Sequence, residues 1–310
     1  MRKRRKTMEC SKNKKHLTIK AQKKLVTICF LLPAFLVMCA VILYPLLYEL
    51  NLSFRNVTLM NLKSNIYPFI GFDNYLSILK DSSFYSTLLR TLIWTFVNVG
   101  LTVCIGLFLA MLLNAKFPGK KIYRTLLILP WAVPSYISVL TWKGMFNSQY
   151  GAVNIILSKI FPWAHSIPWL TDPSYTFLAC IFINVWVGIP FMMMISIGGL
   201  QSISNELYEA ADVDGATRWQ KTKNITLPLM KSVLTPSIVL SCVWTFNVVN
   251  TILIMTSGVQ SEKSQILVTL MYKDAFEYYK YGHAAAFSVI IFLILLCFSS
   301  LFLKAQKLDD

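Results

Sequence analysis

Long apolar runs constrain the fold of this chain more than any other feature of its sequence. A bilayer core about 30 Å thick takes roughly 20 residues of helix, and lipid offers peptide groups no hydrogen-bonding partner, so a span must satisfy them internally. Six runs meet this requirement and contain no Asp, Glu, Lys, Arg or His: residues 26–48, 91–113, 125–142, 176–200, 232–257 and 284–303. They predict an all-α membrane protein with six transmembrane helices.

Composition agrees with a membrane protein. Only 14% of the residues are charged and 55% are hydrophobic, whereas about 25% are charged in an average soluble domain. The first apolar run follows a basic start, but it is too long for a signal peptide and lacks a small-residue cleavage site, so we expect an uncleaved helix. The seven cysteines are scattered, which predicts neither a disulfide framework nor a metal site.

The distribution of positive charge predicts the orientation of the spans. With six spans, both termini lie on one side, and the segments of that side hold 21 of the 30 Lys and Arg residues, against 9 in residues 51–90, 143–175 and 258–283. Because basic residues accumulate in cytoplasmic segments, both termini are predicted to be cytoplasmic. The basic tail, residues 1–24, is interpreted as a topology signal on anionic lipid rather than a nucleic-acid-binding arm.

Missing chemistry excludes several classes of membrane protein. A transporter driven by protons or sodium usually carries a titratable residue inside the membrane, and the six runs have none. No glycine is followed by Lys and then Ser or Thr, so the chain has no P-loop, and no HExxH or GxSxG pattern is present. We therefore predict no catalytic residue and no bound metal or cofactor. A channel, an assembly scaffold, or a transport subunit energised by another polypeptide remains possible.

The predicted cytoplasmic segment 201–231 is the one with enough pattern to be structured. Ser204 is expected to cap a helix whose first turn carries Glu206, which suits the helix dipole. One face of this helix is apolar, formed by Leu207, Ala210 and Ala211. Gly215 is expected to end it in a left-handed conformation.

A second short helix is predicted to follow this turn. Thr217 and Gln220 have the spacing of a capping box, and Pro228 is expected to close the helix before the fifth span. The result would be a helical hairpin on the membrane surface without catalytic residues, suited to docking another protein.

The hairpin carries a specific motif. Glu209-Ala-Ala-Asp212-Val-Asp214-Gly215-Ala216, followed by Ile225-Thr-Leu-Pro228-Leu, resembles the EAA loop of permease subunits in binding-protein-dependent ABC importers. The resemblance implies a coupling helix that seats in a cleft of an ATPase subunit. It assigns this role to Glu209, Ala210, Ala211, Asp214 and Gly215. ATP and magnesium would then be bound by the partner ATPase.

A second resemblance extends over nearly the whole chain. It is carried by Gly71-Phe-Asp-Asn-Tyr75, Leu112-Leu-Asn114, Tyr123-Arg124-Thr-Leu-Leu127, Leu129-Pro-Trp-Ala-Val-Pro134, Lys143-Gly-Met-Phe-Asn147, Tyr272-Lys273 and Tyr281-Gly282-His-Ala284. These segments are similar to carbohydrate importers, most of all the MalF-type permeases of maltose and maltodextrin systems. The resemblance implies the type I ABC importer permease fold in a compact six-span form, because residues 51–90 are too few for a large extracytoplasmic domain.

The fourth and fifth predicted spans combine aromatic and hydrogen-bonding residues, as a sugar site requires. These residues are Asn184, Trp186, Gly188, Pro190, Phe191, Ser241, Trp244, Thr245, Phe246, Asn247 and Asn250. Gly188 and Pro190 are expected to open backbone groups at membrane depth. Ordinary helix packing is the alternative explanation for the polar side chains.

The resemblance assigns the sugar to a subset of these residues and one neighbour. They are Gly188, Phe191, Ser241, Trp244, Thr245 and Val248, and at the last two the family has asparagines. The loss of both amides leaves the identity of the sugar open.

Together, these features predict one subunit of a sugar importer in the cell membrane. Residues 25–310 would form the permease domain, with the coupling loop at 201–231. The implied partners are a second homologous permease, two ATPase subunits, an extracellular solute-binding protein and an oligosaccharide, and nucleic acid is not among them. Maltose or maltodextrin is the predicted substrate. The alternatives are another solute, such as glycerol phosphate or a galactan oligosaccharide, or a scaffold or channel that transports nothing by itself.

Overall fold

The computed structural model describes residues 21, 23–24, 26–64, 66–115, 117–161, 167–257 and 262–307. Over these residues the chain is helical, and one isolated antiparallel bridge joins Arg55 and Phe69. The prediction of an all-α protein is confirmed for this part of the chain. Nearly all of the basic tail 1–24 lies outside the described residues.

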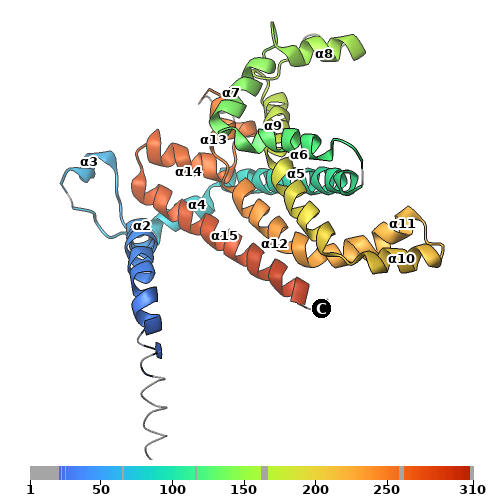
Figure 1. Cartoon of the computed structure of the whole chain (residues 1–310). Coiled ribbons are helices and arrows are strands. Elements are labelled where there is room, and N and C mark those ends of the chain that lie inside the picture. Colours follow the sequence, from blue (N-terminus) through green and yellow to red (C-terminus); the bar gives the residue numbers. More distant parts are fainter. Residues whose placement is uncertain are drawn as a thin grey trace, which may run out of the picture.

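Five helices are long and apolar enough to cross a membrane, and a sixth span results if one bent pair is counted together (Figure 1). The five are Val26–Ser53, Ser82–Asn114, Pro173–Ser202, Arg218–Phe246 and Tyr281–Phe302. The shorter described helices include α3 (Leu59–Leu62), α4 (Asp73–Lys80), α8 (Ala152–Ile160), α10 (Asn205–Val213) and α14 (Leu267–Phe276).

Helices α5 (Ser82–Asn114) and α9 (Pro173–Ser202) form the centre of the bundle. A Cβ atom at Gly106 of α5 would lie 2.9 Å from the Cβ of Met192, so only glycine allows this close approach. Met192 and its neighbour Met193 are fully buried at the contact. Small residues that let helix backbones approach are typical of packing inside membranes.

The predicted span 125–142 is not one continuous helix. Helices α6 (Lys120–Ala132) and α7 (Ser135–Met145) cover it, but they meet at 94°. Pro134 lies at the break, and the residue before it, Val133, has the extended ψ of 136°. Proline disfavours the helical conformation in the preceding residue because its ring clashes with that residue's backbone.

The predicted fifth span, 232–257, is present as Arg218–Phe246, but its bounds differ at both ends. Helix α12 (Leu227–Phe246) stops early, and a non-helical step at 247–249 precedes α13 (Asn250–Met255). At the other end, Pro228 does not separate two helices. It lies in the first turn of α12, and the helix runs back through a π-helical turn, Thr222–Thr226, into α11 (Arg218–Lys221).

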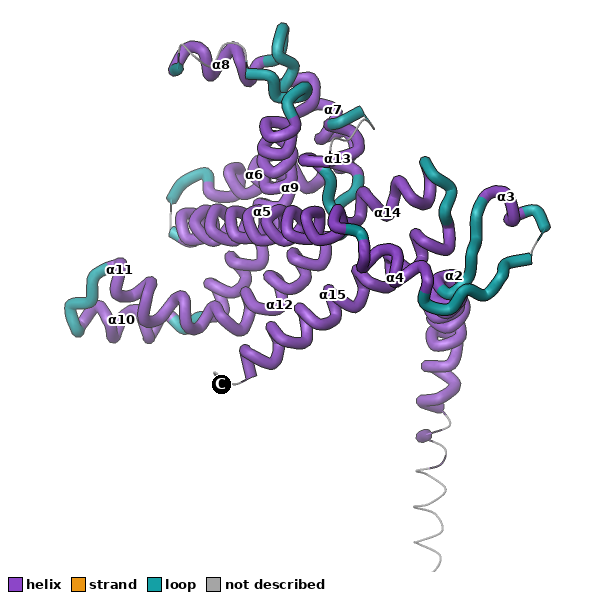
Figure 2. Tube along the Cα trace, turned by 180° about the vertical axis from the view of Figure 1, so that it is seen from behind, coloured by secondary structure: helices purple, strands orange, loops and turns teal. Residues whose placement is uncertain are grey.

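The first span stands apart from the bundle. Its last part, α2 (Tyr44–Ser53), packs against α15 (Tyr281–Lys307), whereas the rest projects away (Figures 1 and 2). None of the residues in its most apolar window is buried. This helix therefore presents apolar side chains on all sides, as a helix surrounded by lipid does.

Candidate functional site

A cavity of about 160 Å³ opens between α5, α6, α9 and α12. All six residues that the sequence assigned to the sugar line it: Gly188, Phe191, Ser241, Trp244, Thr245 and Val248. The remaining lining residues are Val99, Thr102, Trp131, Asn184 and Val187. The structure thus brings the assigned residues of two spans together at one place.

Aromatic rings form one wall of this cavity. The rings of Phe191 and Trp244 have centroids 5.0 Å apart and planes inclined at 55°. Trp131 of α6 also lines the cavity. Trp131 was not predicted to belong to the site, although it lies within the motif Leu129-Pro-Trp-Ala-Val-Pro134, because the bend after α6 could not be foreseen. Aromatic faces of this kind pack against the C–H faces of a sugar ring.

Gly188 keeps α9 close to α5 beside the cavity. A Cβ atom there would lie 3.2 Å from Cγ2 of Thr102, tighter than an ordinary van der Waals contact. Gly188 and Pro190 were expected to open backbone groups at membrane depth, and α9 nevertheless continues through both residues. Proline within a helix removes one hydrogen-bond donor. Pro190 therefore leaves one backbone carbonyl of α9 without its helical donor, rather than opening a whole segment.

A chain of buried hydrogen bonds fixes the cavity walls. Nδ2 of Asn184 donates to Oδ1 of Asn98 over 3.1 Å, and Nδ2 of Asn98 donates to the Trp94 carbonyl over 2.7 Å. Nε1 of Trp94 then donates to the Thr245 carbonyl over 2.9 Å. The chain joins α9, α5 and α12. Sequence reasoning missed Asn98 and Trp94, although an amide within the second apolar run was a signal.

The cavity is uncharged. None of the described lining residues is Asp, Glu, Lys, Arg or His, and the polar side-chain groups are three hydroxyls, one amide and two indole N–H groups. Such groups donate to and accept from neutral hydroxyls, but they provide no counter-ion for a carboxylate or a phosphate. A buried charge without a partner is costly. The cavity is therefore suited to a neutral, hydroxyl-rich solute.

The predicted hairpin within 201–231 is present, with the expected caps. Oγ of Ser204 accepts from the Glu206 amide over 3.3 Å at the start of α10. Gly215 has a φ of +73°, the left-handed conformation expected for it. Thr217 and Gln220 form the predicted capping box at α11.

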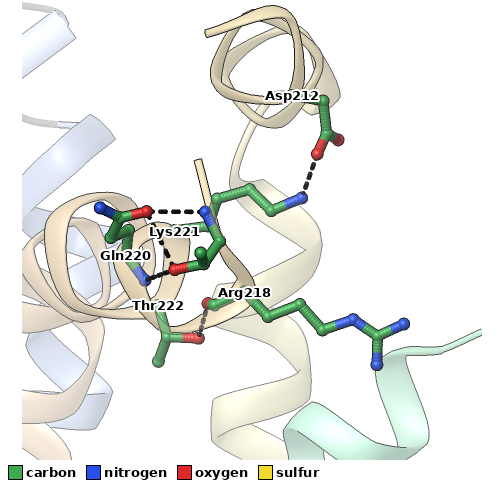
Figure 3. A network of polar contacts seen from close by, with 6 residues as sticks. Asp212, Arg218, Gln220, Lys221 and Thr222 are labelled. Carbon is green, nitrogen blue, oxygen red and sulfur yellow. Dashed lines mark hydrogen bonds and ion pairs between the residues drawn. The ribbon is translucent and has the colours of Figure 1, made fainter. Parts of the chain in front are cut away.

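Contacts between the two arms hold the hairpin together (Figure 3). Nζ of Lys221 reaches across to Oδ1 of Asp212 over 2.5 Å. Near the base, the hydroxyl groups of Tyr208 and Thr226 lie 2.9 Å apart. The sequence did not single out these pairs, since they join residues 9 and 18 positions apart.

The motif residues of the hairpin face outward. Glu209, Ala210, Asp214 and Gly215 are exposed, and Ala211 is half-buried. Val213 is 89% exposed and Trp219 is 71% exposed. The hairpin protrudes from the bundle far from α8 (Figures 1 and 2). Its surface therefore combines exposed acidic groups with exposed apolar side chains.

Known proteins have sequences similar to this one. Residues 102–306 match the family of the binding-protein-dependent transport system inner membrane component. The maltodextrin transport system permease protein MalC of Streptococcus pneumoniae is 33% identical over 299 residues, which cover 90% of this chain and 69% of that protein. The trehalose/maltose transport system permease protein MalF of Thermococcus litoralis is 34% identical over 281 residues, covering 89% and 92%.

The fold also has a solved counterpart. A chain of a bacterial ABC transporter involved in the import of the acidic polysaccharide alginate superposes with a TM-score of 0.79 at 22% identity, covering 94% of this chain and 98% of that one. At this identity the likeness concerns the fold alone. The resemblance to sugar permeases found in the sequence motifs is confirmed by the relatives. The chain belongs to the family of inner membrane components of binding-protein-dependent transport systems, and it is a permease subunit of an ABC transporter rather than an enzyme.

Proposed function

We propose that this chain forms one half of the translocation pore of an ATP-driven importer for a neutral oligosaccharide of the maltose or maltodextrin class. The observation that carries the proposal is the uncharged cavity between α5, α6, α9 and α12, with its aromatic wall and its hydroxyl and amide groups. The sugar would stack on Phe191 and Trp244 and exchange hydrogen bonds with Ser241 and Thr245.

The chemistry of the cavity disfavours one of the alternative solutes and is compatible with another. Glycerol phosphate would need a cation for its phosphate, and the described lining residues include none. A galactan oligosaccharide is neutral and fits the same chemistry. The maltodextrin class is favoured by the names of the two relatives at 33% and 34% identity.

The remaining subunits follow from this role. An extracellular solute-binding protein would deliver the sugar, a second homologous permease would complete the pore, and two ATPase subunits would bind ATP and magnesium. Both termini and the hairpin would lie in the cytoplasm. This orientation rests on the excess of basic residues in those segments.

Coupling to the ATPase would be mechanical. Exposed Glu209 would pair with a basic residue in a cleft of the ATPase, and Ala210 and Ala211 would allow close approach. Closure of the ATPase dimer would pull α10, and the motion would reach the cavity because α11 and α12 are one continuous helix. Rigid elements that move as units are a common means of transmitting such changes.

Stimulation of ATP hydrolysis tests the proposal. The chain would be co-expressed with its neighbouring permease and an ATPase subunit, placed in nanodiscs, and assayed with binding proteins that are empty or loaded with maltodextrin. Stimulation only by the loaded binding protein is expected. If the complex assembles but maltodextrin does not stimulate ATP hydrolysis, the assignment of maltodextrin as the substrate is refuted. If no ATPase subunit associates with the chain, a scaffold or a channel is favoured instead.

A further inference from the structure

A separate cavity of about 360 Å³ lies between the hairpin and the bundle. The ends of the spans α5 and α9 form one side of it, and both arms of the hairpin form the other. Among the described residues, none of those that line it also lines the sugar cavity or is proposed to dock the ATPase subunit. The proposed function therefore leaves this cavity unexplained.

Two cationic side chains line the cavity, and they differ in their partners. Nζ of Lys221 contacts Oδ1 of Asp212 over 2.5 Å. The guanidinium group of Arg218 forms neither a hydrogen bond nor an ion pair with any residue that the structure describes. In Figure 3 it extends away from the pair formed by Asp212 and Lys221. The cavity therefore carries a positive charge for which the described residues supply no counter-ion.

Two side-chain amides line the same cavity. Asn114 is the last residue of α5, and Asn205 is the first residue of α10. The side chain of neither forms a hydrogen bond within the described part of the chain. Each amide nitrogen carries two N–H donors. None of the described lining residues is Asp or Glu, so no negative side chain in the wall would repel an anion.

Hydrogen bonds between hydroxyl groups and the hairpin fix the remaining wall. Oγ1 of Thr222 donates to the Arg218 carbonyl over 3.0 Å. The hydroxyl groups of Tyr208 and Thr226 lie 2.9 Å apart and join the two arms. These contacts keep the arm that carries Asn205 beside the arm that carries Arg218. Groups that are already held in place lose less freedom when they bind a ligand.

Phosphate is the anion that these donors fit best. A guanidinium group binds two phosphate oxygens through two parallel hydrogen bonds. The two amides lie on different elements from Arg218, so the donors reach the cavity from α5, α10 and α11. A tetrahedral phosphate presents oxygens in several directions, whereas a carboxylate presents two oxygens in one plane. The arrangement therefore favours a phosphate group over a carboxylate.

The position of the cavity offers two sources of phosphate. Met111 of α5 and Leu200 of α9 add apolar surface on the side of the spans. The hairpin is predicted to be cytoplasmic, and the cytoplasmic leaflet contains anionic lipids that attract Lys and Arg. Such a lipid would place its phosphate beside Arg218 and its apolar part beside Met111 and Leu200. Free phosphate in the cytoplasm supplies the same charged group.

We propose that this cavity is a phosphate-binding site, in which Arg218 binds two oxygens and the amides of Asn114 and Asn205 bind the others. The ligand is the phosphate group of an anionic lipid or free phosphate. Because the donors come from a span and from both arms of the hairpin, a bound phosphate links the hairpin to the end of α5. The site goes beyond the proposed function, since it concerns neither the sugar nor the ATPase cleft.

Thermal unfolding of the complete importer in an uncharged detergent tests the proposal. Phosphatidylglycerol would be titrated against diacylglycerol with the same acyl chains, and inorganic phosphate against chloride at the same ionic strength. A ligand that binds only the folded protein raises the thermal midpoint. Phosphatidylglycerol, inorganic phosphate or both should raise it more than the matched control. Arg218→Gln should need about 3-fold to 10-fold more of the ligand for the same shift.

Two further variants keep the test specific. Asn114→Leu removes an amide from the opposite wall and should weaken the effect in the same direction. Lys223→Gln removes an exposed cation of the same hairpin that does not line the cavity, and it should stay within about twofold of wild type.

The pattern of shifts identifies the source of the phosphate. A shift with phosphatidylglycerol alone supports the lipid, and a shift with inorganic phosphate supports the free anion. The site is overturned if neither ligand exceeds its control, if Arg218→Gln and Asn114→Leu both keep the wild-type response, or if Lys223→Gln weakens it as much as Arg218→Gln does. None of these results bears on the sugar or on coupling to the ATPase.

Discussion

Replacement of Gly215 tests whether the hairpin transmits force. The residue has a φ of +73°, and an added Cβ would meet nothing within 4 Å, so the cost of a side chain is conformational rather than steric. A left-handed conformation costs an L-residue about 1–2 kcal/mol. Such a cost changes a two-state ratio about 5-fold to 30-fold. Gly215→Val should therefore reduce the population of the docking-ready hairpin, and with it transport, by that factor.

A graded series makes this prediction sharper. Asparagine tolerates the left-handed conformation better than alanine, and valine is worse because it is β-branched. Rates of sugar-stimulated ATP hydrolysis and sugar uptake should fall in the order glycine, asparagine, alanine, valine, with equal amounts of each variant in the membrane. Transport by Gly215→Val at the wild-type rate would refute the coupling role of the hairpin.

Three further changes test the fold around the site. Trp94→Phe removes the hydrogen-bond donor to the buried Thr245 carbonyl, which should cost about 1–3 kcal/mol of stability and lower the thermal midpoint of the purified complex. An unchanged midpoint would contradict the stabilising role of this chain of hydrogen bonds. Gly282→Ala should prevent normal packing of α15, because its Cβ would collide with the Arg55 carbonyl oxygen, and little folded protein should be recovered. The pKa of Asp81 is lowered chiefly by the hydrogen bond from the Ser83 side chain. The ionised Asp81 carboxylate therefore stabilises the fold fully at pH values above the ordinary pKa of aspartate, and this stabilisation is lost as the pH falls through the lowered pKa of the folded protein. The difference in thermal midpoint between wild type and Asp81→Asn should thus shrink on acidification. A difference that does not depend on pH would contradict the stabilising role of the Asp81 carboxylate.

Most of the spans could be predicted because lipid imposes a simple requirement on length and polarity. The effect of each proline on its helix could not be predicted from the sequence in the same way. Pro134 accompanies a 94° bend, whereas Pro130, Pro190 and Pro236 lie inside helices. Whether a helix continues past proline depends on neighbouring helices that supply packing and alternative hydrogen bonds, and a single sequence does not contain that information.

The break at 247–249 had no local signal at all. It contains Asn247, Val248 and Val249, with neither glycine nor proline. The six assigned cavity residues were placed by resemblance within two spans, and the structure brought them together. Thr102 and Trp131 come from other spans, and their arrival at the same cavity depends on helix packing and on the bend after α6.

Uptake of labelled maltotriose into proteoliposomes tests the central claim most directly. The complete importer, with loaded binding protein outside and ATP inside, would be compared with a complex carrying Trp244→Ala. The account predicts that wild type accumulates the sugar, and that the variant loses most of the uptake while its hairpin still supports ATP hydrolysis stimulated by the binding protein. Undiminished uptake by Trp244→Ala would contradict the assignment of this cavity to the sugar.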